Sequence, residues 1–317
     1  MNKLRVSVSP HIRCGETTTG IMLDVIIAMI PAFAAAIYFF GVRALYITSI
    51  CVLTCVLGEL AFQLIAKREV TINDLSAVVT GMLLAFNLPV TIPEWQAIIG
   101  SLVAIVVVKQ LFGGIGYNFA NPAATARVMM LISFSGTLTH WTEPHNPDLL
   151  ASATPLSMIK EGDHEALPSL FSMIIGDRAG SMGETCAVAL IIGFVYLLLR
   201  RVVTWHTTVV YIVTVFAFSY LAMGFDLELA IYQIFAGGLL LGAIFMATDY
   251  ATTPPTPLGK VIFGFGCGII TVAVRLWGSN PEGVSFAILF MNILTPYISR
   301  LTARRVVGAK KPEKKTA

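Results

Sequence analysis

Charged residues are scarce in this chain, since Asp, Glu, Lys and Arg make up only 12% of its 317 residues. A soluble domain usually carries about 25% charged residues. The hydrophobic fraction is 56%, and the mean hydropathy of +0.80 is too high for a soluble core. These values exclude a soluble enzyme and favour an all-α polytopic membrane protein. The basic residues are scattered beside the expected helix ends, so we expect membrane lipid as a partner and no nucleic acid.

Metal-binding patterns are also missing from the sequence. An iron–sulfur cluster needs about four converging cysteines, but the five cysteines are dispersed and none forms a C-x-x-C pair. The five histidines lie mostly in expected loops, which argues against haem ligation between helices. We therefore expect no metal site.

Ten apolar segments approach the roughly 20 residues that a membrane-spanning helix needs. They are 21–40, 44–66, 75–90, 95–112, 118–136, 184–200, 205–224, 227–247, 258–278 and 282–300. The third is short and ends in Asn87-Leu88-Pro89, which favours a broken or half-length helix. Segment 1–20 is polar, and the apolar run after it is too long for the core of a signal peptide, so we expect a spanning helix there.

The distribution of basic residues predicts the orientation of these segments. With both termini in the cytoplasm, 16 of the 21 Lys and Arg residues lie on the cytoplasmic side, four lie on the outer side, and Arg127 lies within the fifth segment. We therefore expect a cytoplasmic segment 1–20, five helices over 21–136, an outer-face loop 137–183, five helices over 184–301 and a basic cytoplasmic tail 302–317.

Two short patterns recur about half a chain apart. Gly81 and Gly238 lie in similar apolar stretches separated by 157 residues, and Asn121-Pro122 and Asn280-Pro281 are separated by 159. Such matches favour a duplication, and an odd number of helices in each half implies two inverted five-helix repeats. The alternative is coincidence, because Gly and Asn-Pro are common in membrane helices.

Polar residues within or beside the apolar segments are candidates for a functional site, because burying them in a membrane is costly. Asn121-Pro122 fits the start of a helix, and the glycines before it would let the backbone bend toward a ligand. A cap and a bend with no ligand explain that pattern equally well. Asp249 fits an ion relay, a cofactor contact or an ordinary helix end, and Arg127 needs a carboxylate, a phosphate or an outer cavity as its partner. The candidates for ion-path or cofactor contacts are Asp249, Asp74, Glu59 and Arg127.

Three motifs resemble the family of membrane flavin subunits that contains RnfD and NqrB. They are Gly113-Gly114-Ile115-Gly116-Tyr117-Asn118-Phe119-Ala120-Asn121-Pro122-Ala123, Ala247-Thr248-Asp249 and Ser152-Ala153-Thr154-Pro155-Leu156. The resemblance covers essentially the whole chain. The lack of a long N-terminal extension favours the RnfD form over NqrB, the quinone-reductase member.

The resemblance implies a covalent cofactor on Thr154. In this family a threonine takes FMN through a phosphodiester bond, which a flavin transferase installs from FAD on the outer side of the membrane. Asp148 and Ala153 match the motif around that threonine, whereas Ala151 and Ser152 depart from its usual hydroxyl and glycine. From the residues alone, Thr154 or Ser152 would be an ordinary helix cap before Pro155.

The resemblance also implies a second, noncovalent flavin such as riboflavin, and we expect Asn118 and Asn121 to lie near it. It implies an electron carrier in the bacterial inner membrane, working with RnfA, RnfB, RnfC, RnfE and RnfG to couple ferredoxin and NAD chemistry to Na⁺ or H⁺ translocation. The chain has no ferredoxin or NAD motif, so we expect no complete active site on it alone. The rival function is a secondary transporter or channel, which an inverted repeat and intramembrane acids would suit equally well.

Overall fold

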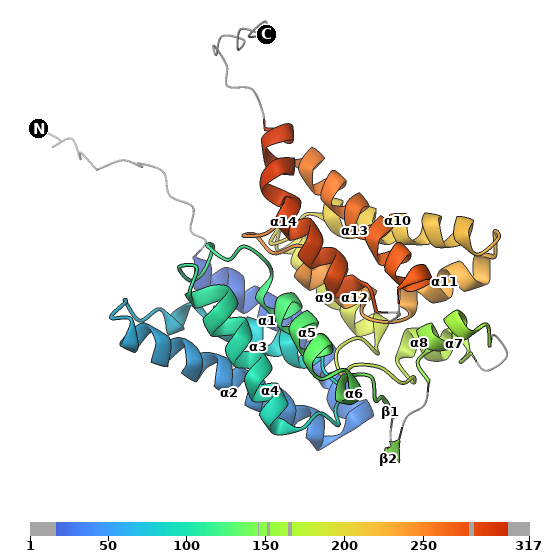
Figure 1. Cartoon of the computed structure of the whole chain (residues 1–317), viewed down its shortest axis with the longest axis horizontal. Helices are drawn as coiled ribbons and strands as arrows, with labels where there is room; N and C mark the ends of the chain where they lie inside the picture. The colour runs from blue at the N-terminus through green and yellow to red at the C-terminus, as the bar shows by residue number, and fades with distance from the viewer. Residues whose placement is uncertain (1–16, 145, 151–152, 164–166, 279–281, 304–317) are drawn as a thin grey trace, which may run out of the picture.

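Helices form nearly all of the molecule in the computed structural model, which describes residues 17–144, 146–150, 153–163, 167–278 and 282–303 (Figure 1). The first group of helices, blue to green in Figure 1, fills one side of the view. It contains α1 (Thr18–Phe40), α2 (Val42–Ile65), the 3₁₀-helix η1 (Ile72–Asp74), α3 (Ser76–Phe86), α4 (Glu94–Leu102), the π-helix η2 (Val103–Gln110) and α5 (Pro122–Ser133).

The second group, yellow to red in Figure 1, lies beside the first. It contains α9 (Ala187–Leu199), α10 (Trp205–Ala222), α11 (Leu227–Phe235), α12 (Leu239–Leu241), the π-helix η3 (Gly242–Met246), α13 (Pro257–Trp277) and α14 (Val284–Thr302). The two groups meet where α1 packs against α9 and α5 packs against α14. Gly193 of α9 lies directly against the backbone of Ala28 in α1, and any side chain there would clash. Such small residues allow membrane helices to approach closely.

A segment of short elements connects the two groups. It contains α6 (Ser135–Leu138), β1 (Thr142–Glu143), β2 (Asn146–Leu150), α7 (Pro155–Glu161) and α8 (Leu170–Ile175). The strands pair antiparallel, with Thr142 opposite Leu150 and Glu143 opposite Asn146. In Figure 1, α7 and α8 lie beside α11, on the opposite side of the molecule from the start of α1 and the end of α14. The buried side chains Leu156 and Ile159 fix α7 against Tyr232 of α11 in a small apolar cluster.

The chain is a multi-pass membrane protein, but the prediction of ten full spans is only partly confirmed. Each of the ten segments contains a helix, yet five helices of the described part are individually long and apolar enough to cross a membrane, namely α1, α2, α10, α13 and α14. A sixth span arises if α11 and the helix 239–246, bent by 61°, are counted together. The bend follows Ala236, whose backbone is extended, and Gly237, whose φ is positive.

The remaining predicted segments form shorter helices. The third was expected to be half-length, and α3 is indeed only 11 residues long. Pro89 and Pro93 follow it closely, and proline removes the backbone donor that a continuing helix needs. The helices α5 and α9 have only 12 and 13 residues, because polar or glycine-containing loops occupy part of each predicted segment.

Candidate functional site

Thr154 caps the start of α7. Its hydroxyl oxygen accepts a hydrogen bond from the backbone N–H of Ser157 at 3.2 Å, and the hydroxyl lies 3.3 Å from the Ser157 hydroxyl. The residue is half-buried and Ala153 before it is exposed. Asp148 lies in strand β2, whereas Ser152 and Ala151 lie outside the described residues. The helix cap expected from the residues alone is therefore confirmed, and it leaves the hydroxyl at the edge of the fold.

Asn118 and Asp249 meet at a second place, where the two helix groups face each other. Asn118 Nδ2 donates to Asp249 Oδ2 at 3.3 Å and to the backbone oxygen of Ala120 at 3.0 Å. Asp249 also accepts from the Thr252 hydroxyl at 3.2 Å. Desolvation raises the pKa of the Asp249 carboxyl above its ordinary value, and these donors oppose the rise. Two residues 131 positions apart thus form one polar pair.

A cavity of about 100 Å³ opens beside this pair, and we call it the inner cavity. Its walls are mostly apolar and come from both helix groups, including Val79, Leu83, Leu197, Ile244 and Phe245. A neighbouring cavity of about 250 Å³ shares Asp249, Tyr250 and three further residues with it. Both π-helices border the inner cavity, η2 through Lys109 and η3 through Ile244 and Phe245. Single-turn π segments occur frequently at functional sites.

Both the oxygen and the nitrogen of the Asn121 side-chain amide form hydrogen bonds. Its side-chain oxygen accepts from the backbone N–H of Ala124 at 3.1 Å, which confirms the predicted cap before Pro122. Its amide nitrogen donates to the backbone oxygen of Met246 at 3.2 Å. Asn121 therefore ties α5 to the end of η3, while still lining the inner cavity.

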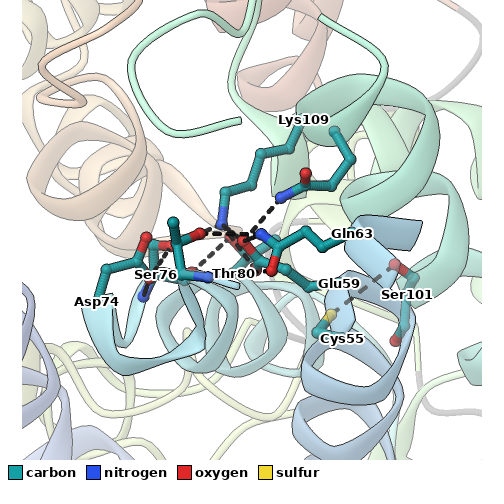
Figure 2. Close-up of polar contacts among 10 residues, drawn as sticks. Cys55, Glu59, Gln63, Asp74, Ser76, Thr80, Ser101 and Lys109 are labelled. Carbon is teal, nitrogen blue, oxygen red and sulfur yellow. Dashed lines mark hydrogen bonds and ion pairs between the residues drawn. The ribbon is translucent and has the colours of Figure 1, made fainter. Parts of the chain in front are cut away.

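Glu59 lies at the centre of a buried polar network, which we call the glutamate network (Figure 2). Lys109 Nζ lies 2.9 Å from Glu59 Oε2 and 3.1 Å from Oε1. The side-chain amides of Gln110 and Gln63 donate to Glu59 Oε1 at 2.7 Å and 3.3 Å. Glu59 and Lys109 are 0% and 3% exposed. The charge of this carboxylate is thus matched by one cation and two amide donors.

Asp74 belongs to the same network (Figure 2). It accepts from the backbone N–H of Ser76 at 2.8 Å and from the Ser76 hydroxyl, and that hydroxyl accepts from Lys109 at 2.6 Å. The sequence indicated Asp74 and Glu59 as separate candidates, and the fold joins them through Ser76 and Lys109. Because Ser76 is the first residue of α3, its bond to Asp74 also gives Asp74 a structural role at the start of that helix.

Arg127 lies in a second buried charge cluster, which we call the arginine cluster. Its partner is a carboxylate, as the first of the predicted alternatives required, because Nη2 pairs with Glu282 Oε2. The guanidinium lies 5.6 Å from the centre of the Trp141 ring. Arg178, Glu184 and Arg275 complete the cluster. Three of its buried nitrogens have no hydrogen-bond partner within the described residues: Arg127 Nη1, Arg178 Nε and Arg275 Nε.

Comparison with known proteins decides the family. A model of the NQR2, RnfD, RnfE family matches residues 5–308. The chain belongs to this family. It is 44% identical over 318 residues to the D subunit of the Na(+)-translocating ferredoxin:NAD(+) oxidoreductase complex of Acetobacterium woodii, with 99% of each chain covered. It is 36% identical to the D subunit of the proton-translocating ferredoxin:NAD(+) oxidoreductase complex of Clostridium ljungdahlii, with 95% of each chain covered.

A third relative is the D subunit of the ion-translocating oxidoreductase complex of Haemophilus influenzae, 34% identical over 95% of this chain and 96% of the relative. The resemblance that the three motifs indicated is therefore confirmed. The first two relatives are named for the same kind of oxidoreductase complex but for different ions, so family membership does not select Na⁺ or H⁺.

Sequence reasoning missed the arginine cluster as a unit. It singled out Arg127, but Arg178 and Arg275 entered only as two of the four basic residues placed on the outer side, and Glu184 and Glu282 were not considered. A usable signal was present, since Glu184 and Glu282 each lie at the start of an apolar segment. It likewise named Glu59 without Lys109, which lies 50 residues later.

Proposed function

We propose that this chain is the membrane-embedded D subunit of an ion-translocating ferredoxin:NAD⁺ oxidoreductase complex, and that it carries electrons through FMN bound covalently to Thr154. Membership of the family and the high coverage of its relatives from such complexes support the first part. The position of the Thr154 hydroxyl supports the second part, because it lies next to an exposed residue at the start of a short helix beside the main helix groups. A transferase needs such access to form a phosphodiester bond.

The surroundings of Thr154 fit an anionic group. FMN brings a phosphate, and the arginine cluster near α7 holds buried N–H groups that lack partners within the described residues. Leu156 lines one small cavity together with Arg127 and Arg275, so the cluster reaches α7. When bound, FMN supplies the electron transfer, and the protein supplies position, burial and hydrogen bonds.

A second, noncovalent flavin is proposed for the inner cavity. An apolar wall with a few polar groups at one end is typical of a cofactor site. Here the polar groups include Asn118 and Asp249, and Asn121 ties α5 to the end of η3. The lining also contains Ser76, Thr80, Lys109 and Thr248. The inner cavity alone is small, but the neighbouring cavity of about 250 Å³ extends it past Asp249 and Tyr250.

We also propose that both termini lie in the cytoplasm and that the Thr154 segment lies on the outer face. The charge distribution supports this orientation. So does the arrangement in Figure 1, where α7 and α8 lie on the opposite side from the start of α1 and the end of α14. Maturation by a flavin transferase on the outer side would then be possible without moving the loop across the membrane.

Two inverted five-helix repeats remain part of the proposal. In the first half α2 packs against α3 and α4, and in the second half α10 packs against α11 and α13. Across the halves, α1 packs against α9 and α5 against α14. These matched contacts support the repeat. Asn280 and Pro281, which carry one of the sequence matches, lie outside the described residues.

Coupling to Na⁺ or H⁺ and assembly with RnfA, RnfB, RnfC, RnfE and RnfG complete the proposed function. Asp249 is the better candidate for an ion path, because it borders two cavities. Glu59 and Asp74 are bonded within the glutamate network, which favours a structural role for both.

The test is covalent flavin on the denatured protein. The complex is produced with its flavin transferase, and flavin fluorescence of this subunit is recorded after denaturing electrophoresis. Wild type should fluoresce, Thr154→Ala should not, and Thr154→Ser should keep part of the signal because it retains a hydroxyl. Thr139→Ala is the matched control, since Thr139 is an exposed threonine of the same connecting segment. A dark wild-type band in the presence of the transferase would refute the proposal.

A further inference from the structure

A cavity of about 280 Å³ lies between α7, the end of α10, α11 and α13, and we call it the outer cavity. One wall is apolar and consists of Leu156, Ile159, Met223, Leu229 and Leu276. Gln233 and Arg275 add polar groups to the lining, and the exposed Lys160 also borders the cavity. An apolar wall that faces a few polar groups is the usual composition of a site for a planar organic molecule.

Arg275 is the buried charge of this cavity. Its Nη1 donates to the backbone oxygen and the side-chain oxygen of Gln233, at 2.6 Å and 2.8 Å, and its Nη2 donates to the backbone oxygen of Ala236 at 3.0 Å. Its Nε has no partner within the described residues. A guanidinium has five N–H groups, so these three bonds leave two N–H groups uncommitted in a side chain that is 4% exposed.

The charges around Arg275 do not neutralise one another. The arginine cluster holds three arginines, Arg127, Arg178 and Arg275, against the two carboxylates of Glu184 and Glu282. One positive charge is therefore left over. Burying an uncompensated charge costs several kcal/mol, so the cluster has a strong preference for an anionic neighbour.

Two glycines let the cluster approach α7. A Cβ atom at Gly237 would lie 2.5 Å from Leu156 Cδ1 and 3.5 Å from Arg275 Nη2. A Cβ atom at Gly238 would lie 2.7 Å from Glu184 Oε2. The bend after α11 thus brings Leu156, Arg275 and Glu184 together at one point.

The outer cavity begins within reach of Thr154. Leu156, two residues after the cap, is the first residue of α7 in its wall, and Lys160 is the last. With a rise of about 1.5 Å per residue, these positions lie roughly 3 Å and 9 Å along the helix from Thr154. A ring tethered through a phosphate and a five-carbon chain would span that distance.

We propose that the outer cavity receives the flavin ring attached at Thr154, and that the uncommitted N–H groups of Arg275 face the ring edge that becomes anionic on reduction. This inference rests on the proposed flavinylation of Thr154. Two electrons that originate from reduced ferredoxin and one proton from solvent leave the reduced ring with one negative charge. A fixed guanidinium at that edge stabilises the reduced form over the oxidised form.

The rival explanation is that Arg275 serves only as a cap for the C-terminal carbonyls of α11. That role explains its two bonds to backbone oxygens, but not the two remaining N–H groups or the excess charge. The two explanations predict different midpoint potentials and different solvent access for the flavin. The decisive measurements are therefore made on the flavin and not on turnover.

The first experiment compares Arg275→Gln and Arg275→Lys in the complete complex produced with the transferase. Covalent loading, measured by fluorescence of the denatured subunit, should be unchanged in both. Loss of a charged donor should weaken binding of the reduced ring relative to the oxidised ring about tenfold, which lowers the midpoint potential by about 30 mV for a two-electron couple. The relevant flavin is the one that disappears from the spectrum in Thr154→Ala. Arg275→Lys should recover part of the shift.

The second experiment changes no residue of the arginine cluster, so its result does not depend on whether the arginine variants fold. Met223→Trp fills the outer cavity from its apolar wall, whereas Leu221→Trp, at an exposed position two residues earlier, is the matched control. Quenching of the covalent flavin by iodide should rise several-fold in Met223→Trp and stay at the wild-type level in Leu221→Trp.

The outcomes separate the two proposals. A wild-type subunit without covalent flavin refutes the proposed function itself. A loaded wild type whose potential is unchanged in Arg275→Gln, and whose quenching is unchanged in Met223→Trp, overturns the outer-cavity proposal and leaves flavinylation of Thr154 standing.

Discussion

The glutamate network and the arginine cluster are both buried charge groups, yet they are completed differently. Glu59 receives two bonds from Lys109 and one each from Gln110 and Gln63. In the arginine cluster, each of the three arginines keeps a buried nitrogen without a partner in the described residues. Native proteins pair nearly all buried polar groups. The difference indicates that the polar groups of the glutamate network find their partners within the chain. The unpaired nitrogens of the arginine cluster are suited to a bound ligand.

The location of each group fits this difference. The glutamate network connects α2, α3 and η2 within one half of the molecule. The arginine cluster lies where α5, α11 and α13 approach the connecting segment, beside the helix that begins at Thr154. Variants that remove one charged partner from the glutamate network or from the arginine cluster therefore test whether the two groups differ in this way.

The largest effect is expected for Glu59→Leu. It leaves the buried Lys109 ammonium without its carboxylate, which should lower the free energy of unfolding by about 3–5 kcal/mol. The double variant Glu59→Leu/Lys109→Met should recover most of that loss. Thermal unfolding in detergent measures both, with the exposed Glu69→Leu as control. If the double variant is as unstable as the single one, the network does not act as a closed charge pair.

The next effect concerns removal of the flavin. Protein made with the transferase should be more stable than protein made without it by about 2 kcal/mol, because a charge-assisted contact satisfies the arginine cluster. The advantage should disappear in Arg275→Gln and persist in Glu69→Leu. Unfolding of loaded and unloaded samples of each variant gives the comparison. If flavin loading stabilises Arg275→Gln as much as wild type, the arginine cluster does not contact the cofactor.

A smaller loss, about 1 kcal/mol, is expected for Arg127→Met. Desolvation raises the pKa of the Glu282 carboxyl, and the charge of Arg127 opposes that rise. Without Arg127, Glu282 can take up a proton, since its side chain is 22% exposed. Removing an ion-pair partner therefore costs less here than in the glutamate network. Unfolding in detergent should rank the two variants in that order, and equal losses would remove the distinction between the groups.

The smallest effect is a pH dependence at Asp249. Desolvation raises its pKa above 3.8 in the folded chain. Between the two pKa values the folded chain binds more protons than the unfolded chain, so this residue lowers stability as pH rises through that window. Asp249→Asn should match wild type at acid pH and exceed it toward neutral pH. The gain should be less than about 1 kcal/mol, because hydrogen bonds from Asn118, Thr252 and the backbone N–H of Ala251 offset the cost of burying the charge. Parallel stability curves would contradict the assignment.

Hydropathy and short motifs predicted much of the architecture. The ten apolar segments each contain a helix, because membrane transfer energy depends on local composition, and Asn121 caps α5 as its motif indicated. The lengths of α5 and α9 were wrong, since hydropathy does not report where an apolar stretch leaves the helical conformation. The partners of Glu59 and Arg127 were not predicted either, although Glu282 stands at the start of an apolar segment. Glu282 lies 155 positions from Arg127, and only packing decides that they meet.

The π-helix η2 changes the spacing of the residues that lead to Lys109 and Gln110. Each turn of a π-helix contains about one residue more than an α-helical turn, so η2 acts as a local insertion. Through it, the consecutive residues Lys109 and Gln110 both reach the same carboxylate. Deleting one residue within η2 would return this stretch to α-helical spacing, in which Lys109 and Gln110 would lie about 100° apart around the helix axis. The spacing of η2 is therefore as important for the network as the chemistry of the residues at its end.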